Sequence, residues 1–288
     1  MKLLFLIVSL VSATAQDIFV PFFSGNGNHL AVNLLAYYQF EENAGDAAKD
    51  SSIWGRDLVV SGVAPILNPY QTGGILGNGK GYAGGDSNSA DETDYYKRTD
   101  ASFNFAGDFT IAGWVNGDWT GPGVISLPHF TVTSKGQFAV DLAWYVSFDK
   151  PDPNSISMSF WWSKNGTANF NVSTPAAGTQ LGWMFFYVKR EGGLISISYT
   201  PQGSASLVAA TTVNNANSTG ALFNSPSDLQ VGNLAGAPGN DYRGTIDELG
   251  FWNRGLPDCE LRWLYKQGSG TPTRTQFDAL DCQNPALP

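Results

Sequence analysis

Side chains that could form a catalytic triad are scarce in this sequence. Only two histidines occur, His29 and His129, and no Gly-x-Ser-x-Gly segment is present to display a serine nucleophile. Glycines alternate at 77, 79 and 81, but no helix pattern follows them. A phosphate-binding loop requires that helix, so the glycine cluster predicts a turn.

Tryptophans are the better candidates for ligand binding, because sugar rings stack on flat aromatic faces and take hydrogen bonds from polar neighbours. The candidates are Trp119, Trp144, Trp161 and Trp162. Alternation along a strand sends Trp161 and Trp162 to opposite faces, which leaves one of them available to solvent. Packing in the core is the alternative for each of the four. Three other tryptophans are assigned to the core: Trp114, Trp183 and Trp252.

The charge balance argues against nucleic acid as a partner. The chain of 288 residues has a net charge of −9 and only 16 Lys and Arg residues, which form no basic run. Three Asn-x-Ser/Thr sequons occur, at Asn165, Asn171 and Asn217, and they matter only in a eukaryotic secretory pathway.

The first 15 residues read as a signal peptide. Lys2 precedes the apolar run from Leu3 to Val11, and Ala13 and Ala15 supply small residues before a cleavage point that would leave Gln16 first. The run is too short to span a bilayer, so we expect an exported protein without stable membrane insertion.

Two cysteines, Cys259 and Cys282, lie near the C-terminus. In an exported protein such a pair usually forms a disulfide, which would contribute about 3 kcal/mol by loop entropy. Two unpaired thiols are the alternative. Zinc is not expected, because no further cysteine is present and both histidines lie far away in the sequence.

Short alternating segments, many glycines and few charges predict an all-β chain. The expected strands are 34–40, 58–60, 109–115, 124–127, 138–144, 155–162, 183–189, 194–199, 207–212, 229–231 and 245–252. Residues 61–102 are expected to be loop-rich because of their glycines. One helix is expected from Pro257 to Gly268, with Leu261, Leu264 and Tyr265 on one face. The pattern predicts a β-sandwich.

Four segments, taken in order, resemble the laminin-G-like jelly rolls of the concanavalin A-like lectin/glucanase superfamily. They are AYYQFEENAGDAAKDSS (Ala36–Ser52), GILGNG (Gly74–Gly79), FTIAGWV (Phe109–Val115) and GTIDELGFWNRGL (Gly244–Leu256). The resemblance implies a two-sheet antiparallel jelly-roll sandwich with one short C-terminal helix. The expected organisation is a signal peptide (1–15), a linker or docking arm (16–33), the sandwich (34–268) and a tail stapled by the disulfide (269–288).

The chain departs from that family in two places. Pro257 stands where a capping Ser or Thr is usual, and residues 53–56 (IWGR) replace an Asn/Gly-rich turn. Glucanases of the superfamily carry a Glu-x-Asp-x-x-Glu pattern on one strand. Here Glu92 and Asp94 begin such a pattern, but Lys97 ends it. No catalytic residue is therefore assigned.

The resemblance also implies one structural calcium ion between the opening and closing segments. Glu41 or Glu42 and Asp247 would be its ligands, together with backbone carbonyls. The alternative is that Asp247 caps the closing turn while the glutamates face solvent.

Three functions remain open at this point. The first is a secreted or surface-displayed, non-catalytic binding module, lectin-like, with a glycan or a cell-surface or structural protein as its partner. The second is a structural or assembly protein, such as a virion surface, fibre or coat component, in which the sandwich is a scaffold and an oligomer is expected. The third is a hydrolase with an unfamiliar site.

Overall fold

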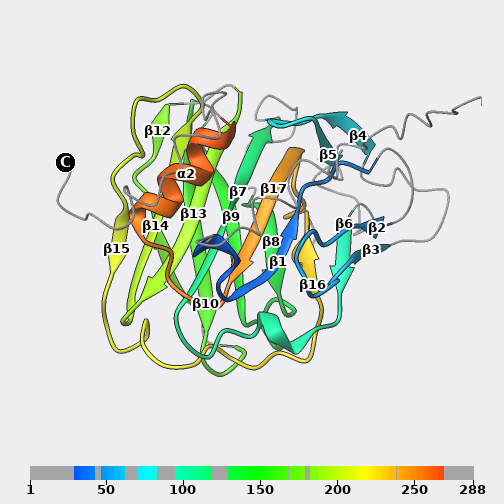
Figure 1. Ribbon diagram of the computed structural model, residues 1–288. Helices are drawn as coiled ribbons and strands as arrows, with labels where there is room; N and C mark the ends of the chain where they lie inside the picture. Colours follow the sequence, from blue (N-terminus) through cyan, green and yellow to red (C-terminus); the bar gives the residue numbers. More distant parts are fainter. Residues whose placement is uncertain are drawn as a thin grey trace, which may run out of the picture.

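The computed structural model describes residues 29–42, 47–61, 70–82, 95–118, 129–152, 154–167, 169–178, 182–237 and 239–268. Within these ranges the chain forms two antiparallel sheets packed face to face, with one helix on the outside (Figure 1). The predicted two-sheet sandwich with a short C-terminal helix is confirmed. No helix in the described ranges has the length and apolar character needed to cross a bilayer.

The eight-stranded sheet follows the order β15-β14-β13-β7-β17-β5-β4, and β1 also pairs with β17. Its strands are β1 (Leu34–Tyr38), β4 (Tyr70–Gly73), β5 (Asn78–Tyr82), β7 (Phe109–Gly117), β13 (Met184–Glu191), β14 (Leu194–Pro201), β15 (Thr211–Val213) and β17 (Gly244–Trp252). The strands from the two ends of the described chain, β1 and β17, therefore lie side by side in its middle.

The nine-stranded sheet follows the order β11-β10-β9-β8-β16-β6-β3-β2, and β12 pairs with β10. Its strands are β2 (Ala47–Ala48), β3 (Leu58–Ser61), β6 (Tyr95–Arg98), β8 (His129–Lys135), β9 (Trp144–Asp152), β10 (Ser155–Ser163), β11 (Asn169–Ser173), β12 (Ala177–Gly178) and β16 (Leu229–Val231). Two short 3-10 helices, η2 (His29–Ala31) and η3 (Ala101–Phe103), complete the connections.

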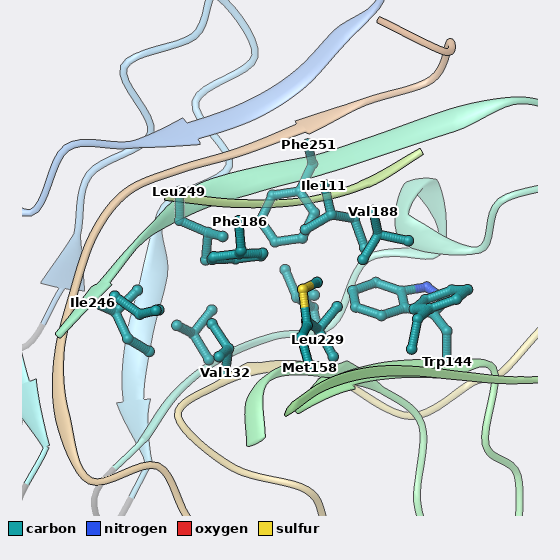
Figure 2. Packing of buried hydrophobic residues seen from close by; sticks show 14 of the residues in the cluster. Ile111, Val132, Trp144, Met158, Phe186, Val188, Leu229, Ile246, Leu249 and Phe251 are labelled. Atoms are coloured by element: carbon teal, nitrogen blue, oxygen red, sulfur yellow. The ribbon is translucent and has the colours of Figure 1, made fainter. Parts of the chain in front are cut away.

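The core lies between the two sheets, as Figure 2 shows. Phe186, Leu249 and Phe251 point down from the eight-stranded sheet onto Val132 and Met158 of the other. All five side chains are at most 2 % exposed. Burial of each such side chain contributes about 1.5–3 kcal/mol, which makes this layer the main source of stability.

Helix α2 (Asp258–Gly268) covers the outer face of the eight-stranded sheet (Figure 1). Its predicted apolar face, formed by Leu261, Leu264 and Tyr265, is buried there. The Tyr265 ring stacks on that of Trp114 at 5.6 Å, and its hydroxyl bonds the carbonyl of Pro201. The helix thus buries the second, outer apolar face of this sheet.

Three predictions of local structure differ from the structure. The strand expected at 207–212 is only β15, which begins at Thr211. Residues 138–144 were expected to form a strand, but they form a turn in which Ala139 has φ 59°, and β9 begins only at Trp144. The glycine run was expected to be a turn, but Gly79 and Gly81 lie in β5. A Cβ on Gly79 would stand 2.9 Å from Thr245 Cγ2, so close approach of β17 explains this glycine. The predicted strand 124–127 lies outside the described residues.

Candidate functional site

The outer face of the nine-stranded sheet carries a cluster of aromatic and polar side chains. Strand alternation produces it, because Val146, Phe160 and Trp162 point into the core and their neighbours point outward. Register then places Tyr145 of β9 opposite Trp161 of β10. We call the group formed by His129, Tyr145, Asp149, Ser159 and Trp161 the Trp161 cluster.

The Trp161 indole is held in place but is not closed off. It stacks on the Tyr145 ring, with the two ring centroids 5.7 Å apart and an interplanar angle of 6°. The His129 ring lies at 79° to it in a T-shaped contact, with centroids 6.2 Å apart. Trp161 itself is half-buried. Its Nε1–H has no hydrogen-bond partner within the described part of the chain. That nitrogen is itself buried, so what the residue presents to a ligand is the exposed part of a rigid aromatic ring.

The Asp149 carboxylate organises the polar side of the cluster. Its Oδ1 lies 2.5 Å from His129 Nδ1 and accepts from the Ser147 hydroxyl at 3.0 Å. The Ser159 hydroxyl donates to Oδ2 and lies 2.7 Å from the Ser173 hydroxyl. The hydrogen bond to Asp149 raises the pKa of His129, which favours the imidazolium with both ring nitrogens as donors.

This arrangement is not that of a serine hydrolase. In a catalytic triad the histidine lies between the serine and the aspartate and takes the serine proton. Here Asp149 lies between Ser159 and His129, because each of them bonds one carboxylate oxygen. The histidine is therefore not placed to activate Ser159, and the cluster suits hydrogen bonding rather than nucleophilic catalysis.

The other predicted ligand-binding tryptophans lie elsewhere. Trp144 is 0 % exposed, points into the core in Figure 2, and donates from Nε1 to the Phe103 carbonyl at 2.8 Å. Trp162 is 1 % exposed and donates to the Asn217 carbonyl at 2.7 Å. Neither ring offers a face to a ligand. Both belong to the core, which was the alternative prediction for these two residues. Trp119 lies outside the described residues.

The predicted calcium ligands lie around the turn before β5. Asp247 is fully buried, and its Oδ2 accepts from the amides of Ile75 at 2.9 Å and Leu76 at 3.3 Å. Glu41 Oε2 accepts from the Asn78 amide in the same turn at 3.2 Å. Both side chains therefore lie at this turn, where amide hydrogens already occupy both oxygens of Asp247 and one oxygen of Glu41.

The Glu42 side chain makes a hydrogen bond outside this turn. Its Oε1 accepts from the Lys49 amide at 2.6 Å, while its buried Oε2 has no partner in the described ranges. No group of three or more His, Cys, Asp or Glu residues in those ranges is arranged to hold a metal ion. The calcium site therefore stays a prediction that rests on oxygen donors of the right chemical type.

A buried glutamate beside this group was missed from the sequence. Glu248 is 5 % exposed, sits at φ 51° within a bulge of β17, and accepts from the Tyr37 hydroxyl at 2.6 Å. Burial raises its pKa to about 8, with a further contribution from the charge of Glu41. Burial and the charge of Glu248 also raise the pKa of Asp247. The signal in the sequence is the pair of adjacent acidic residues, Asp247 and Glu248, in a strand whose other side chains are mostly apolar.

Only one of the two cysteines of the predicted disulfide lies within the described residues. Cys259 lies in the first turn of α2, and Cys282 lies outside the described residues. The bridge between them stays a prediction.

No known family model matches the chain, and no curated protein matches it. Solved structures do resemble it. The binding domain of Paraclostridial Mosquitocidal Protein 1 has a TM-score of 0.57 and 14% identity, over 83% of this chain and 53% of that one. The botulinum neurotoxin serotype G binding domain has a TM-score of 0.58 and 14% identity, over 83% and 52%.

A third similar structure has nearly the same length as the aligned region. It is domain 4 of AbnA, a GH43 extracellular arabinanase from Geobacillus stearothermophilus, in complex with arabinotriose. The TM-score is 0.51 and the identity 15%, over 81% of this chain and 98% of that one. This chain spans only about half the length of the toxin domains. At such identities the likeness shows the fold alone.

Proposed function

We propose that this chain is a non-catalytic binding module that recognises carbohydrate through the Trp161 cluster. The observation that carries the proposal is the half-buried Trp161 ring, fixed by stacking on Tyr145. A fixed ring offers stacking without the entropy cost of ordering a mobile side chain. A sugar presents both C–H faces for stacking and hydroxyls for hydrogen bonding, so its chemistry complements this group.

The polar side of the cluster supports the same ligand class. His129 has a side chain that is 29% exposed, and with its raised pKa it offers Nε2–H as a hydrogen-bond donor next to the Trp161 ring. The Asp149 carboxylate accepts hydrogen bonds from Ser147 and Ser159, and its negative charge compensates the positive charge of the His129 imidazolium. A paired charge of this kind suits an uncharged, hydroxyl-rich ligand better than an anion.

The structural neighbours are consistent with a binding role. The two toxin structures are binding domains, and the similar binding domain of botulinum neurotoxin DC is in complex with SialylT. The arabinanase domain is in complex with arabinotriose. We extend the proposal to the place of action: the N-terminal segment 1–15 acts as a signal peptide, and the module works at an extracellular surface.

The test is glycan-array binding by the wild type and by two tryptophan variants. Trp161→Ala removes the stacking ring, and Trp54→Ala is the matched control. Trp54 is 56% exposed but lies between β2 and β3, where its Nε1 donates to the Leu34 carbonyl at 2.7 Å. We expect Trp161→Ala to lose at least tenfold in affinity, a difference of about 1.4 kcal/mol, and Trp54→Ala to bind as the wild type does.

Thermal unfolding of both variants serves to show that they fold. Arrays that stay empty for the wild type, with and without calcium, would overturn the proposal. Equal binding by the wild type and Trp161→Ala would keep a glycan-binding function but remove it from this cluster.

A further inference from the structure

The three sequons of this chain meet at one edge of the nine-stranded sheet, although they span residues 165–219. Asn165 lies in the turn after β10, and Asn171 lies in the middle of β11. The turn that holds Asn217 packs against β10. The Trp162 indole donates to the Asn217 carbonyl at 2.7 Å, and Lys164 Nζ donates to the Ala216 carbonyl at 2.8 Å.

Each sequon offers its asparagine to solvent. Asn165 and Asn171 are exposed, and Asn217 is half-buried in a tight turn. The Asn165 side-chain oxygen accepts from the Thr167 amide at 3.1 Å, and Asn171 Nδ2 lies 3.4 Å from the Ser173 hydroxyl. A large hydrophilic substituent on these amides would project away from the core, so the fold can carry it.

These residues lie near β11, the edge strand of the nine-stranded sheet, where another chain could pair with the backbone. In the described ranges β11 pairs with β10 alone, so its other side forms no strand pairing there. Such an edge is a template for pairing with another chain, and folded proteins block it with charge, proline or bulk. The five residues of β11, NFNVS, contain no charge and no proline.

We propose that Asn165, Asn171 and Asn217 carry N-linked glycans, which shield the β11 edge of the nine-stranded sheet. In this modification the asparagine Nδ2 forms a bond to the anomeric carbon of an oligosaccharide carried on a lipid diphosphate. The bond between that carbon and the diphosphate oxygen breaks, the amide loses one proton, and the lipid diphosphate leaves.

The glycan on Asn171 also bears on the Trp161 cluster. Asn171 and Trp161 are directly opposite each other in the β10–β11 register. Opposite residues on one face have Cβ atoms about 5 Å apart. The glycan therefore stands on the β11 side of the indole, and the Tyr145 ring already stacks on the indole from the β9 side. A bound ligand has to share the β11 side of the ring with the glycan. The modification itself does not depend on the proposed function.

The experiment is expression of the full chain in a eukaryotic secretory host. Intact mass is measured before and after enzymatic removal of N-glycans, which leaves one Asp in place of each modified Asn and so maps the sites. Both the medium and the cell pellet are analysed, so a secretion defect does not hide the result. The variants are Asn165→Gln, Asn171→Gln and Asn217→Gln, with Asn154→Gln as a control at an exposed asparagine outside any sequon.

We expect each sequon variant to lose one glycan and the control to lose none. Removal of all three glycans should shift the protein from monomer to larger species in size-exclusion chromatography. A peptide mass without any glycan in both fractions would overturn the modification. A glycan-free protein that stays as monomeric as the glycosylated one would overturn the shielding role, and neither outcome changes the test of Trp161.

Discussion

Replacement of Glu248 by Gln should make the protein more stable at neutral and alkaline pH. The wild-type carboxyl is 5 % exposed, and its Oε1 has no partner among the residues described. Glutamine has the same length, stays neutral and can still accept from the Tyr37 hydroxyl that now bonds Oε2 at 2.6 Å. The strained φ of 51° is the same for both residues, so the substitution isolates the charge.

The pKa of Glu248 sets the size and the sign of the effect. Burial raises the pKa from its ordinary value of 4.5 to about 8. Between these values the folded protein keeps a proton that the unfolded chain has lost, so the free energy of unfolding falls as pH rises and levels off above pH 8. At about 1.36 kcal/mol per pH unit, the loss reaches at most about 5 kcal/mol.

The assay is thermal unfolding of the wild type and Glu248→Gln from pH 5 to pH 8.5, with the exposed Glu191→Gln as the control. A difference of a few kcal/mol corresponds to a Tm gap of roughly 10 °C for a chain of this size. The gap should be small at pH 5 and widest at pH 8. Parallel pH profiles for the two proteins, or a Glu248→Gln variant less stable than the wild type at pH 8, would refute the reasoning.

Three further outcomes are expected. Calcium, if it binds beside Asp247, should raise the Tm more at pH 8 than at pH 5, because ionised carboxylates are its ligands; no change in Tm at either pH would count against the site. Gly250→Ala should destabilise by about 1–3 kcal/mol in urea unfolding, since the new Cβ would stand 2.3 Å from the Trp252 ring; a wild-type midpoint would contradict this packing. The unreduced protein should be two hydrogens lighter than the reduced one in mass spectrometry if Cys259 and Cys282 are bridged, and an equal mass would mean two thiols.

Much of the fold follows from local pattern. β17 and α2 are visible in the sequence because the strand is long and apolar and the helix begins after a proline and ends at a glycine. β9 was misplaced because apolar residues continue through the turn at 138–143, where Val140 is 59% exposed. Hydrophobicity alone does not distinguish that turn from a strand, since the positive φ at Ala139 is a tertiary effect.

Only part of the Trp161 cluster could be predicted from the sequence. Alternation correctly separates Trp161 from Trp162, and the structure decides which of them faces outward. His129 and Asp149 meet because β8 and β9 pair in one particular register, with a bulge between Thr131 and Thr133. Register depends on the whole sheet, so a single sequence does not reveal that contact. The same holds for Glu248 and Tyr37, which belong to the last and first strands of their sheet.

The position of β17 also constrains how the protein can be synthesised. This strand lies between β7 on one side and β1 and β5 on the other, and it is the last strand of the described chain. A ribosome therefore releases every other described strand before β17, and until residue 252 has emerged the edges of β1 and β7 that pair with β17 stay unpaired. Folding that waits for such distant contacts is slow and prone to aggregation. We expect a newly made chain to need chaperone protection over most of its translation.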